Sequence, residues 1–181
     1  MIPLLILSSS LSLAAKEGSL KDLDKHAGFR ELPFGAKCDE IDGFKGNKQA
    51  LKVAGAGRTD KEPYMGMVQY RNPDDELVIG STALLDVAYT CYRDRLMSVQ
   101  LLTWGPRAAD DLLYTFTTAF GGPPMADADL GTWRWEGKKV SLELAHDRPT
   151  DAVTAVFTSL PAVEQKRADD VALRRSAVED L

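Results

Sequence analysis

Alternating apolar and polar positions recur along the chain and predict a set of short β-strands. The period of two is clearest at Val140, Leu142 and Leu144, whose side chains would share one face of a strand. β-Branched and aromatic residues strengthen the pattern, and polar or glycine-containing turns separate the segments. Strands are predicted at residues 67–71, 77–80, 87–92, 96–102, 132–136, 140–144 and 152–160, with a short edge strand within residues 29–35.

A helical period replaces the alternation at residues 107–120. Pro106 stands at a first-turn position, where its missing N–H costs nothing, and residues 121–124 (Gly-Gly-Pro-Pro) end the segment. The apolar stripe of this helix would face the core. It consists of Leu112, Leu113, Phe116 and Phe120. A short helical turn is also predicted at residues 38–41.

The order of these elements predicts an α+β fold, in which one long and one short helix pack on one face of an antiparallel β-sheet. The two halves of the chain follow a similar order, which suggests a duplicated α-βββ unit, although the residues themselves do not visibly repeat. We expect a linker at residues 16–27 and a single domain at residues 28–160. The charged tail at residues 161–181 fits either a helix or a disordered end.

The first fifteen residues differ in character from the remainder and predict a secretory signal peptide. Residues 2–15 carry no charge, the first charged side chain is Lys16, and Ser12 and Ala14 occupy positions typical of a cleavage site. The segment is shorter than the ~20 residues of a membrane-spanning helix, and no cysteine follows for a lipid anchor. We therefore expect a soluble periplasmic or secreted protein. Because no Lys or Arg precedes the apolar run, a buried element of a cytoplasmic protein is the alternative.

Charge and composition restrict the possible partners. The chain has 181 residues with 22 basic and 27 acidic side chains, which give a net charge of -5. No cluster of Lys and Arg with interleaved aromatic residues occurs, so nucleic acid is not an expected partner. A protein or a component of the cell envelope is expected instead, with no stable membrane span and no cofactor.

Two cysteines, Cys38 and Cys91, allow two interpretations. In an oxidising compartment they would form a disulfide, whereas in the cytosol they would remain two separate buried thiols. A metal site is not expected, because there is no Cys-x-x-Cys motif and neither His26 nor His146 has a suitably spaced partner.

No arrangement of residues predicts catalysis, and no catalytic residue is assigned. The only candidates for acid–base chemistry are scattered carboxylates and the His146-Asp147 pair, and no Gly-x-Ser-x-Gly motif is present. The glycines of residues 54–58 lack the features of a phosphate-binding loop and predict turns. Cysteine and histidine chemistry would require Cys38 or Cys91 to remain a free thiol.

Three tryptophans are the candidate binding residues. Trp133 and Trp135 lie two positions apart and would share one face of a strand, and Trp104 follows the earlier hairpin. Aromatic side chains commonly anchor interfaces, so an exposed platform would be a recognition surface. The alternative is that Trp133 and Trp135 fill the core beneath the long helix.

Several fragments resemble a widespread group of uncharacterised bacterial exported proteins, and the resemblance covers residues 28–160. They are residues 28–35 (Gly-Phe-Arg-Glu-Leu-Pro-Phe-Gly), 70–71 with 77–80, 87–89 and 133–137. This chain differs from the group at one hairpin, which has Arg93-Asp94-Arg95 where an Asp-Gly turn would be expected. More distantly, the layout is similar to the beta-lactamase-inhibitor protein and to small outer-membrane assembly lipoproteins, both of which are binding folds.

The resemblance carries no activity. Together with the expected signal peptide and the lack of a catalytic motif, these observations predict an exported, non-catalytic binding module for a protein or a cell-envelope component, of an inhibitor or assembly type. The alternative function is a small secreted hydrolase that uses cysteine and histidine or carboxylate chemistry.

Overall fold

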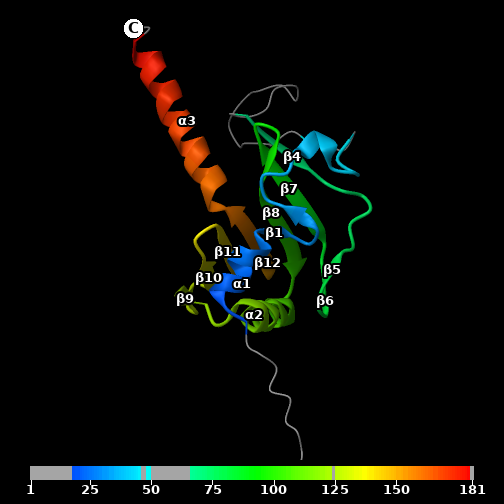
Figure 1. Cartoon of the computed structure of the whole chain (residues 1–181). Helices are drawn as coiled ribbons and strands as arrows, with labels where there is room; N and C mark the ends of the chain where they lie inside the picture. The colour runs from blue at the N-terminus through cyan, green and yellow to red at the C-terminus, as the bar shows by residue number, and fades with distance from the viewer. Residues whose placement is uncertain (1–17, 46–47, 50–65, 124, 180–181) are drawn as a thin grey trace, which may run out of the picture.

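A computed structural model describes residues 18–45, 48–49, 66–123 and 125–179 (Figure 1). The expected signal peptide at residues 1–15 and the glycine-containing loop at residues 54–58 lie outside the described residues. The helices are α1 (Leu20–His26), the 3-10 turn η1 (Cys38–Glu40), α2 (Pro106–Phe120) and α3 (Leu160–Glu179). The strands are β1 (Gly28–Phe29), β2 (Leu32–Pro33), β3 (Lys48–Gln49), β4 (Met67–Tyr70), β5 (Val78–Ile79), β6 (Thr82–Ala83), β7 (Asp86–Tyr92), β8 (Arg95–Trp104), β9 (Met125–Asp127), β10 (Thr132–Glu136), β11 (Val140–Asp147) and β12 (Ala152–Ser159).

One antiparallel sheet organises the molecule and confirms the α+β fold. Its eight strands lie in the order β3-β4-β7-β8-β12-β11-β10-β9, and β1-β2 and β5-β6 form two small separate sheets. Each half of the large sheet winds inward, so that the last strands of the two halves, β8 and β12, pair at the centre. Each half contributes four strands to this sheet, where the expected α-βββ unit has three, and duplication as the origin of the mirrored order stays a prediction.

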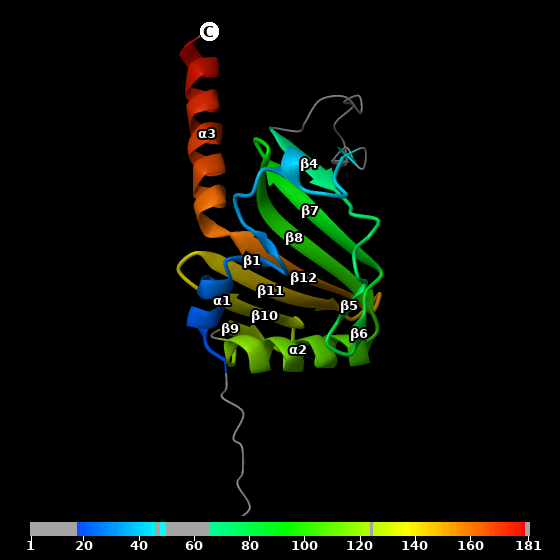
Figure 2. The ribbon, with the colours of Figure 1, turned by 45° about the vertical axis from the view of Figure 1, so that its right-hand side comes forward.

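The long predicted helix is confirmed as α2, which packs on the sheet beside β8, β11 and β12 (Figure 2). Leu112 and Phe116 are buried, as the apolar stripe predicts. The Phe116 ring lies 6.0 Å from the Trp135 ring and 5.6 Å from the Phe157 ring, both in edge-to-face contact. α2 therefore closes one face of the core.

The expected linker at residues 16–27 is wrong, because α1 occupies most of it. Ser19 and Asp22 form a capping box, and Ala27 ends the helix in the left-handed conformation. Leu23 is only 2% exposed and belongs to the core. A seven-residue helix offers too few turns for its apolar period to stand out from a charged segment.

The predicted edge strand within residues 29–35 is instead a small hairpin of β1 and β2 that covers the core. Phe29 is buried against Tyr89 and Phe157, with ring centroids 6.4 Å and 5.6 Å away. Arg30 occupies the turn with a φ of 51°. The segment therefore belongs to the layer that covers the main sheet and forms its own two-stranded sheet.

The larger hairpins agree with the predicted pattern. Arg93 and Asp94 have φ values of 47° and 61°, so both adopt left-handed conformations in the turn between β7 and β8. This geometry corresponds to the twist-compatible hairpin turn that Asn-Gly and Asp-Gly usually provide.

The charged tail is helical over α3, the first of the two alternatives for residues 161–181. α3 follows β12 directly and extends beyond the end of the sheet (Figures 1 and 2). Its hydrogen bond with Tyr92 comes from Asp169, in its first half, and residues 171–176 are all exposed. Within the described part of the chain, no helix is both long and apolar enough to cross a membrane.

Cys38 and Cys91 form a disulfide, as the first of their two interpretations predicts. The bond joins η1 to β7 across a sequence separation of 53 residues, and both cysteines are buried. It fixes the irregular segment after β2 to the main sheet.

Candidate functional site

A pocket of about 470 Å³ lies beside the first turns of α3, and we call it the α3 pocket. Three parts of the chain that are distant in sequence form its walls: the end of α1 with the segment after β2, the β7–β8 turn, and the β11 start with the β12–α3 junction. Its lining residues are Ala27, Phe34, Gly35, Tyr92, Arg93, Arg95, Lys139, Val140, Ser159, Pro161, Ala162 and Gln165.

The interior of the α3 pocket is mainly apolar, and the hydroxyl groups in its lining each have one hydrogen bond to the protein. The Tyr92 hydroxyl donates to the Asp169 carboxylate at 2.6 Å. The Ser159 hydroxyl oxygen accepts from the backbone N–H of Ala162 at 3.4 Å. The interior thus offers few polar partners, so a strongly polar group placed inside would lose most of its hydrogen bonds to water, which disfavours such groups there.

One acidic residue fixes α3 as a wall of this pocket. Asp169 accepts from Tyr92, pairs with Arg93 at 3.1 Å and accepts from Gln165 at 3.0 Å. The hydrogen bond from Tyr92 is the largest of the effects that lower the pKa of Asp169 below its usual value, while burial and the same bond raise the pKa of Tyr92. Asp169 thus attaches α3 to the β7–β8 hairpin, about one helical turn beyond Gln165, the last residue of α3 that lines the pocket.

The charged lining residues of the α3 pocket are all basic. Arg93 is paired with Asp169, whereas Arg95 and Lys139 form no ion pair with any described residue. Arg95 donates one hydrogen bond to the carbonyl of Gly35 at 3.0 Å, and both Arg95 and Lys139 are exposed. The rim is therefore locally positive on a chain whose net charge is -5.

Asp24 positions the Lys139 side of the rim. Its carboxylate accepts from the backbone N–H groups of Lys138, Lys139 and Val140 at 2.7, 2.7 and 3.2 Å. Burial acts to raise the pKa of Asp24, but these three donors and the Lys139 charge lower it below the usual value. The turn before β11 is thereby attached to α1.

The predicted binding tryptophans lie in three different environments and form no common platform. Trp135 is fully buried, and its indole Nε1–H donates to the carbonyl of Gly121 at 2.7 Å. Trp133 shares the core face and is half-buried.

Trp104 is 64% exposed and donates to the carbonyl of Thr150 at 2.8 Å. Because β8 alternates with Thr103 buried, Trp104 lies on the opposite face of the sheet. The platform of Trp133 and Trp135 is therefore wrong, and their alternative role in the core is confirmed for Trp135.

A second, smaller pocket of about 290 Å³ lies at the β9–β10 edge and includes Trp133 in its lining. Its lining carries two acidic residues, Asp127 and Glu143, and one basic residue, Arg134, which pairs with Glu136 at 2.7 Å. The charge at this edge is therefore net negative, which disfavours an anion there.

The candidates for catalysis are dispersed. Both cysteines are in the disulfide, so neither is a free thiol for cysteine–histidine chemistry. His146 lies 3.3 Å from the Asp151 carboxylate at the end of β11, and His26 is exposed on α1. Among the residues that the structure describes, no group of three metal-ligating side chains could hold a metal ion.

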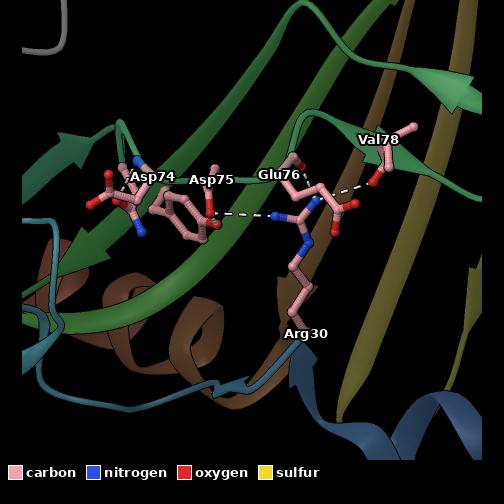
Figure 3. A network of polar contacts seen from close by, with 7 residues as sticks. Arg30, Asp74, Asp75, Glu76 and Val78 are labelled. Carbon is pink, nitrogen blue, oxygen red and sulfur yellow. Dashed lines mark hydrogen bonds and ion pairs between the residues drawn. The ribbon is translucent and has the colours of Figure 1, made fainter.

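The Asp75 side chain is 9% exposed and lies in a network of polar contacts, which Figure 3 shows. Arg30 lies 3.4 Å from Asp75 Oδ1 and also donates to the backbone carbonyls of Glu76 and Val78. The Tyr89 hydroxyl donates to the same Asp75 oxygen at 2.9 Å. Burial raises the pKa of both Asp75 and Tyr89, although Arg30 and the Tyr89 hydrogen bond counteract the rise at Asp75. These contacts hold the loop before β5 against β1 and β7, which is a structural role.

Comparison with known proteins finds no relative: no family model, curated protein or solved structure matches this chain. The resemblance of residues 28–160 to exported bacterial proteins, and to the beta-lactamase-inhibitor protein architecture, stays a prediction.

Sequence analysis did not identify the α3 pocket. Its residues come from segments separated by more than one hundred positions, and no local motif joins them. The nearest sequence signal is Arg93-Asp94-Arg95, which stands where a hairpin turn usually has Asp-Gly. This replacement places two cations, Arg93 and Arg95, at the pocket.

Proposed function

We propose that the protein is an exported, non-catalytic binding module for a component of the cell envelope, and that the α3 pocket is its binding site. The observation that carries this proposal is an apolar cavity whose charged lining residues are all basic. Its volume falls within the range of about 300–1,000 Å³ that is usual for small-molecule sites.

Export rests on two observations. Residues 1–15 have the pattern of a signal peptide, and a disulfide joins the two cysteines of the chain. We expect mass spectrometry of the native protein from fractionated cells to find a mature N terminus at residue 15 or 16 and oxidised Cys38 and Cys91. An uncleaved, reduced chain in the cytosol would contradict export.

Binding is tested with a bulky side chain in the pocket and a matched change outside it. Ala162 lines the pocket, whereas Ala168 is exposed on the same helix and does not. A thermal-shift panel of defined envelope components would contain single-chain and double-chain lipids, glycan fragments and acidic apolar peptides. We expect at least one class to stabilise the wild type and Ala168→Trp but not Ala162→Trp.

If no class of the panel distinguishes Ala162→Trp from Ala168→Trp, the α3 pocket is not the binding site. Because Ala162→Trp could disturb the start of α3, Gln165→Trp serves as a second blocking variant at an exposed lining position. Circular dichroism of all three variants verifies that each retains the fold.

A further inference from the structure

We propose that the ligand of the α3 pocket is a single-chain lipid with an anionic headgroup. The chain occupies the apolar interior, and the headgroup lies at the rim beside Arg95 and Lys139. This inference rests on the proposed function and specifies its ligand.

The interior determines the chemistry of the inserted part. Phe34, Val140 and Ala162 contribute apolar surface. The Tyr92 hydroxyl donates to Asp169, and the Ser159 hydroxyl oxygen accepts from the Ala162 N–H, so the interior offers few polar partners. An acyl chain needs no hydrogen bonds, so it gains from leaving water without creating an unsatisfied polar group.

The rim determines the charge of the headgroup. Arg95 and Lys139 come from different hairpins and form no ion pair with described residues, and the lining contains no Asp or Glu. Arg93 is the third cation, but Asp169 neutralises it. The charge of Lys139 also acts on the Asp24 carboxylate, so Arg95 is the less compensated of the two cations. A carboxylate or phosphate headgroup therefore meets Arg95, whose planar donors suit either anion, together with Lys139.

The size and shape of the site favour one chain over a protein surface. A single cavity of about 470 Å³ lies in the lower part of the range for small-molecule sites. Protein partners instead meet broad surfaces of about 800 Å² on each side. An acidic apolar peptide is the alternative occupant, and it is an arm of the test.

The test measures dissociation constants by isothermal titration calorimetry, with ligands below their critical micelle concentrations. The probes are fatty carboxylates of 8, 10 and 12 carbons, an alkyl lysophosphate, and the alcohol and amine of 12 carbons. We expect the carboxylate to bind about fourfold more tightly for each methylene that the pocket buries. The amine should bind more weakly than the alcohol, and the carboxylate or the lysophosphate most tightly.

Charge variants locate the headgroup. Arg95→Gln and Lys139→Gln should each weaken binding of the anionic lipid by up to about fivefold, as expected for exposed charge pairs, and leave the alcohol unaffected. Arg107→Gln and Lys138→Gln are the matched controls, because both residues are exposed and neither lines the pocket. The controls should bind all probes as the wild type does.

The outcomes separate this inference from the proposed function. Equal affinity for amine and carboxylate, or lipid binding that Ala162→Trp and Gln165→Trp leave intact, would overturn the anionic-lipid site. If lipids fail but an acidic apolar peptide binds in a manner that both blocking variants abolish, the ligand class is wrong and the proposed function stands. If no probe of either panel depends on the pocket, both are wrong.

Discussion

At the scale of the residue, the environment of a side chain matters more than its type, and the tryptophans illustrate this. Trp135 fills the core beneath α2 and has a buried hydrogen bond to Gly121, whereas Trp104 lies 64% exposed on the opposite face of the sheet. Removal of the first creates a cavity and leaves a partly buried carbonyl without its donor. Removal of the second creates no core cavity, and the exposed Thr150 carbonyl that it frees can bind water instead.

We expect Trp135→Ala to lower the free energy of unfolding by about 3–5 kcal/mol, a cost typical of removing a large buried aromatic side chain. Trp104→Ala, the control, should change it by less than about 1 kcal/mol. Urea unfolding followed by circular dichroism measures both. Equal losses for the two variants would contradict the assignment of Trp135 to the core.

Asp75 predicts a pH dependence of stability. Burial is the largest effect on this carboxyl and raises its pKa in the folded protein, so the folded state retains the proton over a pH range in which the unfolded state has lost it. The contribution of Asp75 to stability is therefore complete below its ordinary pKa of 3.8 and decreases as the pH rises through the folded-state value.

Asp75→Asn removes this titration and retains an oxygen acceptor for Tyr89 and Arg30. We expect the stability of the variant relative to the wild type to increase between pH 3.5 and pH 7, as measured by urea unfolding at both pH values. A difference that is independent of pH, or one that decreases, would show that Asp75 does not titrate in this manner.

At the scale of the element, the sequence pattern predicts long helices and strands with a clear apolar period, but not short ones. α2 is 15 residues long, with an apolar stripe and flanking Pro and Gly residues, and β11 alternates over its whole buried length, so both could be predicted. α1 has too few residues for a period. β9 has three exposed residues and exists because it pairs with β10, so nothing in its own sequence indicates a strand.

The same argument explains why the α3 pocket could not be predicted from the sequence. The disulfide could be proposed because the chain has two cysteines, but the α3 pocket depends on where the β12–α3 junction lies relative to β2 and the β7–β8 turn. Those distances follow from the strand order β8-β12-β11, which pairs strands distant in sequence. A linear pattern does not contain that order.

The disulfide predicts a large contribution to the stability of the elements that it joins. Closure of a loop of 53 residues corresponds to about 4 kcal/mol in the chain-entropy description. We expect the double variant Cys38→Ser and Cys91→Ser to unfold at a markedly lower guanidinium concentration than the oxidised wild type.

Reductant provides the control for this comparison. A phosphine reductant should shift the wild type toward the midpoint of the double variant and leave the double variant unchanged. An oxidised wild type that unfolds at the same concentration as the double variant would refute the expected contribution.

At the scale of the whole molecule, α3 separates into a part that belongs to the domain and a part that projects from it. Asp169 marks the division, because it is held by Tyr92 and Arg93, and residues 171–176 beyond it are exposed. The first part forms a wall of the α3 pocket, and the second lies outside the fold.

Two truncations test this division. A chain that ends after Asp170 should keep the thermal midpoint of the full chain, because it retains the Asp169 contacts. A chain that ends after Ser159 should melt at a lower temperature, because it exposes Val140 and Tyr92 and leaves the Tyr92 hydroxyl without its partner. Differential scanning calorimetry measures both, and equal midpoints for the two truncations would contradict the division.

The hydrogen bonds of Asp24 have a consequence for the order in which the protein assembles. They join α1 to backbone groups 114 to 116 residues later, just before β11. A ribosome therefore completes α1 long before its docking partner exists, and such distant contacts form late because the chain must first close a long loop. Although α1 is made early, it is among the last elements to reach its native position, and a nascent chain arrested before residue 140 should leave α1 accessible to a protease.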